Sequence, residues 1–274
     1  MKAECLPFAQ IPHTTRLFAD YLAYKPGARA FYPRSPQFAE WVKEENPAIR
    51  YDSCRREAVA TALARQNTLW GASGKTLENI ERLRAGASVV VTGQQVGLFG
   101  GPMFAMYKAL TAVKLAREAK AAGVDTVPVF WLATNDHDLA EVNHAWLAGL
   151  DGTRRLFSTP SRGMEAAPVG TIAFGPEIEP VVAQACDLLG ESDVTEALRA
   201  TYVPGETFGT AFAKLYAKLF AEWGVVLLDP CQTDLQQVAA PMYAKAVERA
   251  SALDAALLER GKALRRRDIT SRLR

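Results

Sequence analysis

The chain has 274 residues, of which 49% are hydrophobic and 23% are charged, and these values are typical of a globular protein with a sizeable core. Its formal net charge of +2 gives no argument for nucleic-acid binding and none against an anionic small molecule. The sequence has no apolar run of the roughly 18 residues that span a membrane, no signal peptide and no CxxC pair, so we expect a cytoplasmic protein with reduced thiols that contacts no membrane.

The first part of the chain predicts a surface segment followed by helices. Residues 1–34 are irregular and rich in proline and aromatic residues, which is typical of a segment that lies over a surface. The segment Gly71-Ala-Ser-Gly-Lys-Thr76 resembles the end of a phosphate-binding P-loop, but Leu69 occupies the position of the first glycine of that motif. We therefore interpret it as a helix–turn–helix junction. Helical periodicity predicts helices at residues 36–45, 52–70 and 75–84.

The middle of the chain predicts a parallel strand–helix–strand unit. The β-branched run from Ser88 to Thr92 indicates a buried strand, and Pro102 stands at the favoured first turn of a helix that ends near Gly123. A second buried strand runs from residue 124 to residue 132. Two such strands joined by one helix form a right-handed crossover in almost all known proteins.

The remainder of the chain predicts an insertion, a third core strand and a long helix. Short strand-like segments separated by proline and glycine indicate a small β-rich insertion with hairpins at residues 145–175. The run from Val225 to Asp229 indicates a further core strand, and residues 241–264 read as one long helix with a charged face. Further helices are predicted at residues 177–190, 193–200 and 207–222.

The first candidate site is the glycine-rich segment between the first strand and its helix. Free N–H groups at a helix N-terminus favour an anion, and glycines let the backbone approach it closely. Two adjacent glutamines could bind a carboxylate, an amide or a sugar hydroxyl. A tight turn is the alternative explanation, but a turn alone does not require the glutamines. The candidate binding residues are Thr92, Gly93, Gln94, Gln95, Gly97, Gly100 and Gly101.

The second candidate site is the polar cluster that follows the second strand. Ligands bind at the carboxyl ends of parallel strands, so we expect this cluster to lie near the glycine-rich segment. One of the aspartates could instead cap a short helix. Histidines seven residues apart on a helix are too distant to share one metal ion, so we expect no metal site. The cluster consists of Asn135, Asp136, His137, Asp138, Glu141, Asn143 and His144.

Three further charged positions are weaker candidates than these clusters. Asp229 ends the third strand and is expected to reach the same edge of the sheet. Lys108 lies about two turns into the helix that Pro102 opens, which predicts that it is too distant to touch a ligand at the helix N-terminus. Arg154 and Arg155 are typical of a solvated hairpin face, although they could hold a carboxylated substrate.

These segments resemble a known family. The residues that carry the resemblance are Thr92-Gly-Gln-Gln-Val-Gly-Leu-Phe-Gly-Gly-Pro102 with Tyr107-Lys108, and Phe130-Trp-Leu-Ala-Thr-Asn-Asp-His-Asp138 with Glu141-Val-Asn-His144. They are similar to BshC, the family assigned to the cysteine-adding step of bacillithiol biosynthesis.

The resemblance implies a ligase that joins L-cysteine to glucosaminyl malate through an amide bond. It also implies a Rossmann-like core with small inserts and a coiled coil through which two subunits dimerise. It leaves the cofactor open, with ATP or another adenine nucleotide as the candidate, since members of the family hold an adenine nucleotide near the coiled coil. The implied boundaries are a first core part at residues 1–144, an insertion at 145–205, a second core part at 206–240 and the start of the coiled coil at 241–274.

The resemblance also frames a catalytic hypothesis. The family usually has glutamate where this chain has Asn135, so we assign proton removal from the attacking amine to His137, with Asp136 holding its tautomer. Asn135, Asp138, Asn143 and His144 are expected to bind substrate. No HxGH or KMSKS-like signature of class I adenylation is present.

Two other functions compete with the ligase. One is a nucleotidyl or acyl transferase that acts on another small anionic substrate in the same cleft. The other is a domain that only oligomerises through its C-terminal helix, which would need sustained apolar a and d positions. The apolar positions of that helix form only a loose stripe, so this function ranks last.

Overall fold

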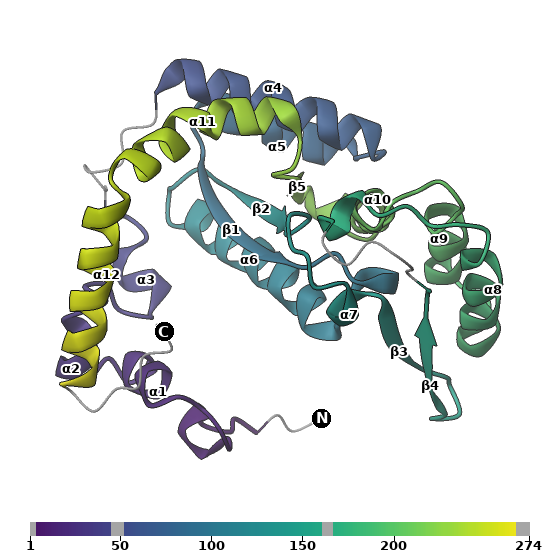
Figure 1. Ribbon diagram of the computed structural model, residues 1–274, viewed down its shortest axis with the longest axis horizontal. Helices are drawn as coiled ribbons and strands as arrows, with labels where there is room; N and C mark the ends of the chain where they lie inside the picture. Colours follow the sequence, from purple (N-terminus) through teal and green to yellow (C-terminus); the bar gives the residue numbers. More distant parts are fainter. Residues whose placement is uncertain (1–3, 45–51, 161–166, 267–274) are drawn as a thin grey trace. The chain divides into compact units, whose positions relative to one another are not determined.

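The computed structural model describes residues 4–44, 52–160 and 167–266 (Figure 1). The contacts between residues divide the chain into two compact units. One unit is Pro47–Val238, and the other combines Met1–Asn46 with Ala239–Arg274. Each unit is described separately below.

A parallel sheet of three strands forms the centre of the larger unit. The strands are β1 (Ser88–Gln94), β2 (Thr126–Leu132) and β5 (Val226–Leu228), in the order β1-β2-β5. Helix α6 (Met103–Ala121) joins β1 to β2, which confirms the predicted strand–helix–strand unit. Pairing runs from Ser88 opposite Thr126 to Gln94 opposite Leu132, so the carboxyl ends of both strands lie side by side.

Helices cover both faces of this sheet because side chains alternate along β2. Val127 and Val129 pack with α4 (Ser53–Leu69) and α5 (Gly74–Ala85). Phe130 and Leu132 belong to the core formed with α6 and α10 (Phe208–Leu219). In Figure 1, α4 and α5 lie on one side of the strands and α6 lies on the other. The expected Rossmann-like α/β architecture is therefore present.

The P-loop-like segment is a junction between two helices, as predicted. α4 ends at Leu69, and the Ser73 side chain accepts a hydrogen bond from the Thr76 N–H to cap α5. The ammonium of Lys75 donates to the backbone oxygen of Glu222 at 3.1 Å. Lys75, the lysine of the P-loop-like segment, therefore stabilises the fold at this turn.

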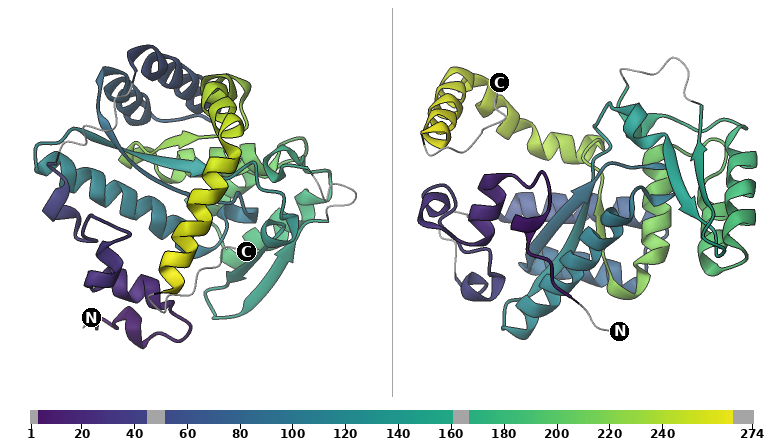
Figure 2. Two further views of the ribbon diagram at one scale, coloured as in Figure 1. Left: turned by 60° about the vertical axis from the view of Figure 1, so that its left-hand side comes forward. Right: turned by 90° about the horizontal axis from the view of Figure 1, so that it is seen from below.

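Between β2 and β5, the described residues contain one hairpin and three helices of nine to twelve residues, one of which is α10. The hairpin pairs β3 with β4 in antiparallel register, and Figure 2 shows it beside α8 and α9. The predicted strand near residue 172 is only an isolated bridge between Ala173 and Thr207. The insertion is therefore less rich in strands than its sequence suggests. The elements are α7 (Leu139–Val142), β3 (His144–Ala148), β4 (Arg154–Ser158), η3 (Val169–Thr171), α8 (Ile178–Leu189), α9 (Asp193–Thr201) and η4 (Ala221–Trp223).

The smaller unit brings the beginning of the chain together with α12 (Ala250–Arg265). The guanidinium of Arg260 lies 5.3 Å from the centre of the Phe31 ring. The segment predicted to be irregular contains short helices, because Thr15 caps α1 through the Phe18 N–H and Pro26 opens α2. The elements of this segment are η1 (Phe8–Gln10), α1 (Arg16–Leu22) and α2 (Pro26–Arg29). The helix predicted at residues 36–45 is a single turn, α3 (Phe38–Trp41), among the described residues.

The prediction of a single long helix at residues 241–264 is wrong in two respects. Helix α11 (Thr233–Glu248) begins eight residues earlier and carries Pro241 in its interior. The helix is then interrupted at Arg249, whose φ of −108° and ψ of 15° are not helical, before α12 begins. None of the helices within the described ranges combines the length and apolar character needed to cross a membrane.

Candidate functional site

A pocket of about 300 Å³ lies where β1 and β2 end. The glycine-rich segment, the start of α6, helix α7 and the first residue of β3 all contribute to its wall. The structure therefore brings the two predicted clusters together. The residues that line the pocket are Gln94, Gln95, Gly97, Gly101, Pro102, Phe104, Glu141, Val142 and His144.

The glycine-rich loop turns sharply between β1 and α6. A side chain at Gly97 would place its Cβ 2.8 Å from the Cα of Gly101, so only glycine allows this approach. Phe99 is buried with a positive φ of 54°, a strained conformation for a residue other than glycine. The loop thus fixes the pocket wall at Gly97 and Gly101 by close backbone packing.

Gly100, which the sequence assigns to ligand binding, is directed into the core instead. Its N–H donates to the Tyr202 hydroxyl at 3.0 Å, and its carbonyl accepts from the Tyr216 hydroxyl at 3.1 Å. Both tyrosines are buried, and this burial raises the pKa of each phenol. Since both backbone groups of Gly100 are bonded to buried side chains, the prediction for this glycine is wrong.

A continuous set of hydrogen bonds connects the two glutamines to the carboxylates of the second cluster. The Gln94 amide donates to Gln95 Oε1 at 2.9 Å. The Gln95 amide nitrogen donates both to Asp136 Oδ2, at 2.7 Å, and to the Glu141 carboxylate. Gln95 therefore holds two carboxylates beside one another.

Lys108 reaches this set of hydrogen bonds, although it is not among the residues that line the pocket. Its ammonium donates to the Gly93 carbonyl at 3.0 Å and to Gln94 Oε1 at 2.9 Å, and it lies 5.5 Å from the Phe104 ring centre. Side chains in a helix tilt towards its N-terminus, so the long Lys108 side chain extends back to the end of β1. A distance based on helical rise alone neglects this tilt.

Asp136 is an ionised acceptor. Its Oδ1 accepts the backbone N–H groups of His137 at 2.7 Å and Asp138 at 3.2 Å, while Oδ2 accepts from Gln95. The hydrogen bond from Gln95 is the main reason that the pKa of Asp136 lies below its ordinary value. This carboxylate can bind a cation or a donor, but it is a poor proton donor near neutral pH.

His137 lies beside the pocket without lining it. Its side chain is 80% exposed, and its Nδ1 is 3.8 Å from Asp136 Oδ1, which is too far for a hydrogen bond. The expected orientation of this ring by Asp136 is therefore absent. His144 lines the pocket instead, and its Nδ1 lies 3.2 Å from the Asn143 amide oxygen.

The chain matches a known protein family along its whole length. A family model described as "Bacillithiol biosynthesis BshC, N-terminal Rossmann-like domain" matches residues 1–274. The chain belongs to the BshC family. This confirms the resemblance carried by the two strand-end segments.

Curated relatives in the BshC family carry the name "Putative cysteine ligase BshC". The protein of Koribacter versatilis is 49% identical over 96% of this chain and 49% of its own length. The protein of Solibacter usitatus is 36% identical over 96% of this chain and 49% of its own length. The protein of Salinibacter ruber is 35% identical over 92% of this chain and 47% of its own length. The chain spans about half the length of the relatives it matches.

The departure from the usual BshC pattern lies outside the pocket wall. Asn135 is exposed and does not line the pocket. Asp138 caps α7 by accepting the Glu141 N–H at 3.2 Å, so the alternative that one aspartate is structural is confirmed for Asp138. Thr92 and Gly93 lie within β1 and do not line the pocket either. Substrate contacts predicted for these positions are not supported by the pocket geometry.

Asp229 reaches the carboxyl edge of the sheet, but it serves the fold. Its side chain is buried and accepts hydrogen bonds from the Thr134 hydroxyl, the Cys231 N–H at 2.9 Å and the Gln232 amide at 3.1 Å. With these donors bonded, Asp229 links the ends of β2 and β5 and leaves little capacity for a ligand.

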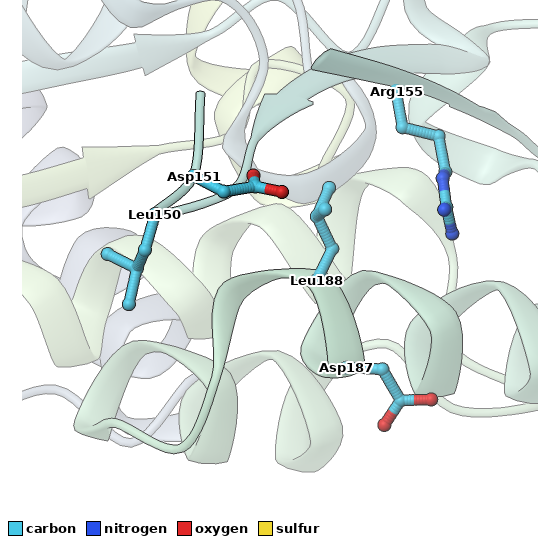
Figure 3. Close-up of a pocket in the computed structure, with 5 residues that line it drawn as sticks. All are labelled: Leu150, Asp151, Arg155, Asp187 and Leu188. Carbon is cyan, nitrogen blue, oxygen red and sulfur yellow. The ribbon is translucent and has the colours of Figure 1, made fainter. Parts of the chain in front are cut away.

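A second hollow, of about 410 Å³, lies between the β3–β4 hairpin and α8 (Figure 3). Arg155 lines it, together with Leu150, Asp151, Asp187 and Leu188. The Asp151 carboxylate already accepts the Thr153 N–H at 2.9 Å and the Thr153 hydroxyl at 2.7 Å, as in an ordinary turn. Arg154 is exposed on the same hairpin. The hollow therefore lacks the convergent polar groups found at the strand ends.

The sequence prediction assigned no binding role to Phe104, Lys108 or Glu141. Phe104 and Glu141 line the pocket, and Lys108 bonds to its wall. A helix-tilt argument could have found Lys108, whereas Glu141 was already a member of the second predicted cluster and lacked only an assigned role. Within the described ranges, no three histidine, cysteine, aspartate or glutamate side chains are grouped as metal ligands.

Proposed function

We propose that this chain is part of a ligase that forms the amide bond between the carboxyl group of L-cysteine and the amine of glucosaminyl malate. The product of this step is bacillithiol. The observation that carries the proposal is the convergence, in a BshC-family chain, of two glutamine amides, the Glu141 carboxylate and His144 at a single strand-end pocket, with the Asp136 carboxylate bonded to one of these amides. The proposal includes a cytoplasmic location and a homodimer, which the sequence suggests.

The pocket suits a small molecule that carries an amine and a carboxylate. The Glu141 carboxylate in the pocket wall attracts an ammonium group, and the Gln94 amide can donate to a carboxylate or a hydroxyl. Both substrates of the proposed reaction have an amine and a carboxylate. A triphosphate fits this wall poorly, because Glu141 is part of it and no lysine or arginine is among the described residues that line it. We assign no step to a nucleotide here.

An amine attacks a carbonyl carbon only when it is unprotonated, so the site needs a proton acceptor. We assign this role to His144, because it lines the pocket and His137 does not. When His144 Nδ1 carries a proton and donates it to the Asn143 oxygen, Nε2 keeps a lone pair. Nε2 then accepts the proton that the amine loses as it attacks a carboxyl group activated as a mixed anhydride with a phosphate. The new C–N bond forms, the C–O bond to the phosphate breaks, and the phosphate leaves with that electron pair.

The experiment that tests the proposal is a thiol profile of a strain that lacks the gene. Bacillithiol should disappear and glucosaminyl malate should accumulate, as measured by mass spectrometry after thiol labelling. The intact gene should restore the thiol, whereas a gene encoding Gln95→Ala should restore less. Unchanged pools in the deletion strain would contradict the ligase and favour a nucleotidyl or acyl transferase that acts on another small anion.

A further inference from the structure

The hydrogen bonds at the pocket form a single path with a charge at each end. The path starts at the Lys108 ammonium on α6 and passes through the Gln94 and Gln95 amides. It ends at Asp136, which follows β2, and at Glu141 in α7. Four elements that are separate in the sequence are thereby connected by side chains alone.

The two charged ends determine the direction of every bond in the path. An ammonium group can only donate, and an ionised carboxylate can only accept. A side-chain amide can turn by 180° and exchange its oxygen with its nitrogen. Turning Gln94 would set its NH₂ group against the Lys108 ammonium, and turning Gln95 would set its oxygen against two carboxylates. Only one pair of orientations therefore satisfies all five polar groups of the path.

We propose that Lys108 is a positioning residue of this pocket, which orients the Gln94 and Gln95 amides and through them holds the Asp136 and Glu141 carboxylates together. The consequence for substrate binding rests on the proposed function. Gln94 Nε2 has two hydrogens and uses one of them for Gln95. Because Lys108 fixes the orientation of Gln94, the second hydrogen of this amide is a fixed donor in the pocket wall. The carboxylates bonded by Gln95 lie at the other end of the same path.

Another exposed lysine of α6 differs from Lys108, which is exposed too, in the partners it bonds. Lys114 is 75% exposed and pairs with Glu118 one turn further along the same helix at 3.5 Å. Such i,i+4 pairs contribute little to stability. Lys108 bonds instead to two oxygen atoms at the end of β1. Lys114→Met is therefore a matched control for Lys108→Met.

The first test follows the side-chain amide signals of Gln94 and Gln95 by NMR in ¹⁵N-labelled protein. Lys108→Met should shift the signals of both amides and increase their exchange with water, while Lys114→Met should leave them unchanged. Lys108→Arg keeps a donor and should restore most of the wild-type pattern. Gln94→Glu keeps an acceptor for Lys108 but cannot donate to Gln95, so it should change the Gln95 signals alone. Unchanged amide signals in folded Lys108→Met would overturn the proposal.

The second test measures the binding of L-cysteine and of glucosaminyl malate by calorimetry. Loss of the oriented amide donor should weaken one of these ligands about tenfold in Lys108→Met, as expected for one charge-assisted hydrogen bond. If the amide signals shift but wild-type protein binds neither compound, the positioning role stands and the proposed function fails. If wild type and Lys108→Met bind equally well, the proposed function stands and the positioning role fails.

Discussion

Two pairs of adjacent side-chain amides have opposite roles in this molecule. Gln66 and Asn67 in α4 are almost completely buried, at 1% and 0% exposure, and bond to the backbone of β5 and its end. Gln94 and Gln95 at the end of β1 are half-buried, line a pocket and bond to other side chains. Residue type alone does not distinguish a structural amide pair from a binding one. The identity of the bonded partners does.

The buried pair replaces a missing neighbour of β5. Asn67 donates to the Leu227 oxygen at 2.8 Å and accepts the Leu227 N–H at 3.0 Å. Gln66 makes the same two bonds with Asp229, at 3.2 Å and 3.1 Å. Each amide thus presents a donor and an acceptor to one residue, as an adjacent strand would. The edge of β5 is satisfied by side chains.

The largest expected effect is therefore on stability, from Asn67→Ala. The substitution leaves the buried N–H and C=O groups of Leu227 without these partners, and each such group costs about 1–3 kcal/mol. We expect the free energy of unfolding to fall by about 2–5 kcal/mol in urea denaturation. Asn135→Ala, at an exposed position, is the control and should change it by less than about 0.5 kcal/mol. Similar values for the two variants would show that the α4 amides do not replace a strand.

The next largest effect should separate the two histidines of the second cluster. A general base contributes about 10²–10⁴-fold to rate, so His144→Ala should lower kcat of the cysteine-adding reaction at least about 10²-fold. His137→Ala should lower it less than about twofold, because that ring is 80% exposed and does not line the pocket. The assay is bacillithiol formation from glucosaminyl malate. A larger loss from His137→Ala would return the proton-accepting role to that residue.

The two amide pairs can be distinguished by measuring the substrate affinity and the free energy of unfolding of both Gln95→Ala and Gln66→Ala. Gln95→Ala should weaken substrate binding about tenfold, because it releases the Asp136 and Glu141 carboxylates from their shared donor, and should leave stability within about 1 kcal/mol. Gln66→Ala should do the reverse, with little change in affinity and a loss of about 2 kcal/mol or more. Equal effects of both variants on stability would mean that the Gln94–Gln95 pair is structural too.

Much of the fold could be predicted from the sequence because its signals are local. The β-branched runs of β1 and β2, Pro102 before α6 and the capping serine of α5 each act within a few residues. The interruption at Arg249 was not predicted, since the apolar and charged pattern continues through it.

The sequence predicts where the site lies in the fold, but not which groups face the pocket. Two polar strand ends in a parallel sheet must lie at one edge, and this rule alone predicts that Gln95 lies near Asp136. The direction of individual groups depends on tertiary contacts. Gly100 faces buried tyrosines and Asp229 faces Thr134, and these partners lie far away in the sequence. Lys108 was missed because its reach depends on the side-chain direction.

The smallest effect concerns the pH dependence of stability at Asp136. Its pKa in the folded protein lies below the ordinary value of 3.8, chiefly because Gln95 donates to the carboxylate, and the backbone N–H groups of Asp138 and His137 lower it further. A lowered folded pKa means that the ionised group stabilises the fold above about pH 4 and that this contribution is lost as the pH falls through the folded pKa. Asp136→Asn should therefore be less stable than wild type at about pH 7, and this difference should shrink towards about pH 3. A difference that stays constant between these pH values would show that the Gln95 bond does not depend on the charge of Asp136, and that the path from Lys108 ends at Glu141 alone.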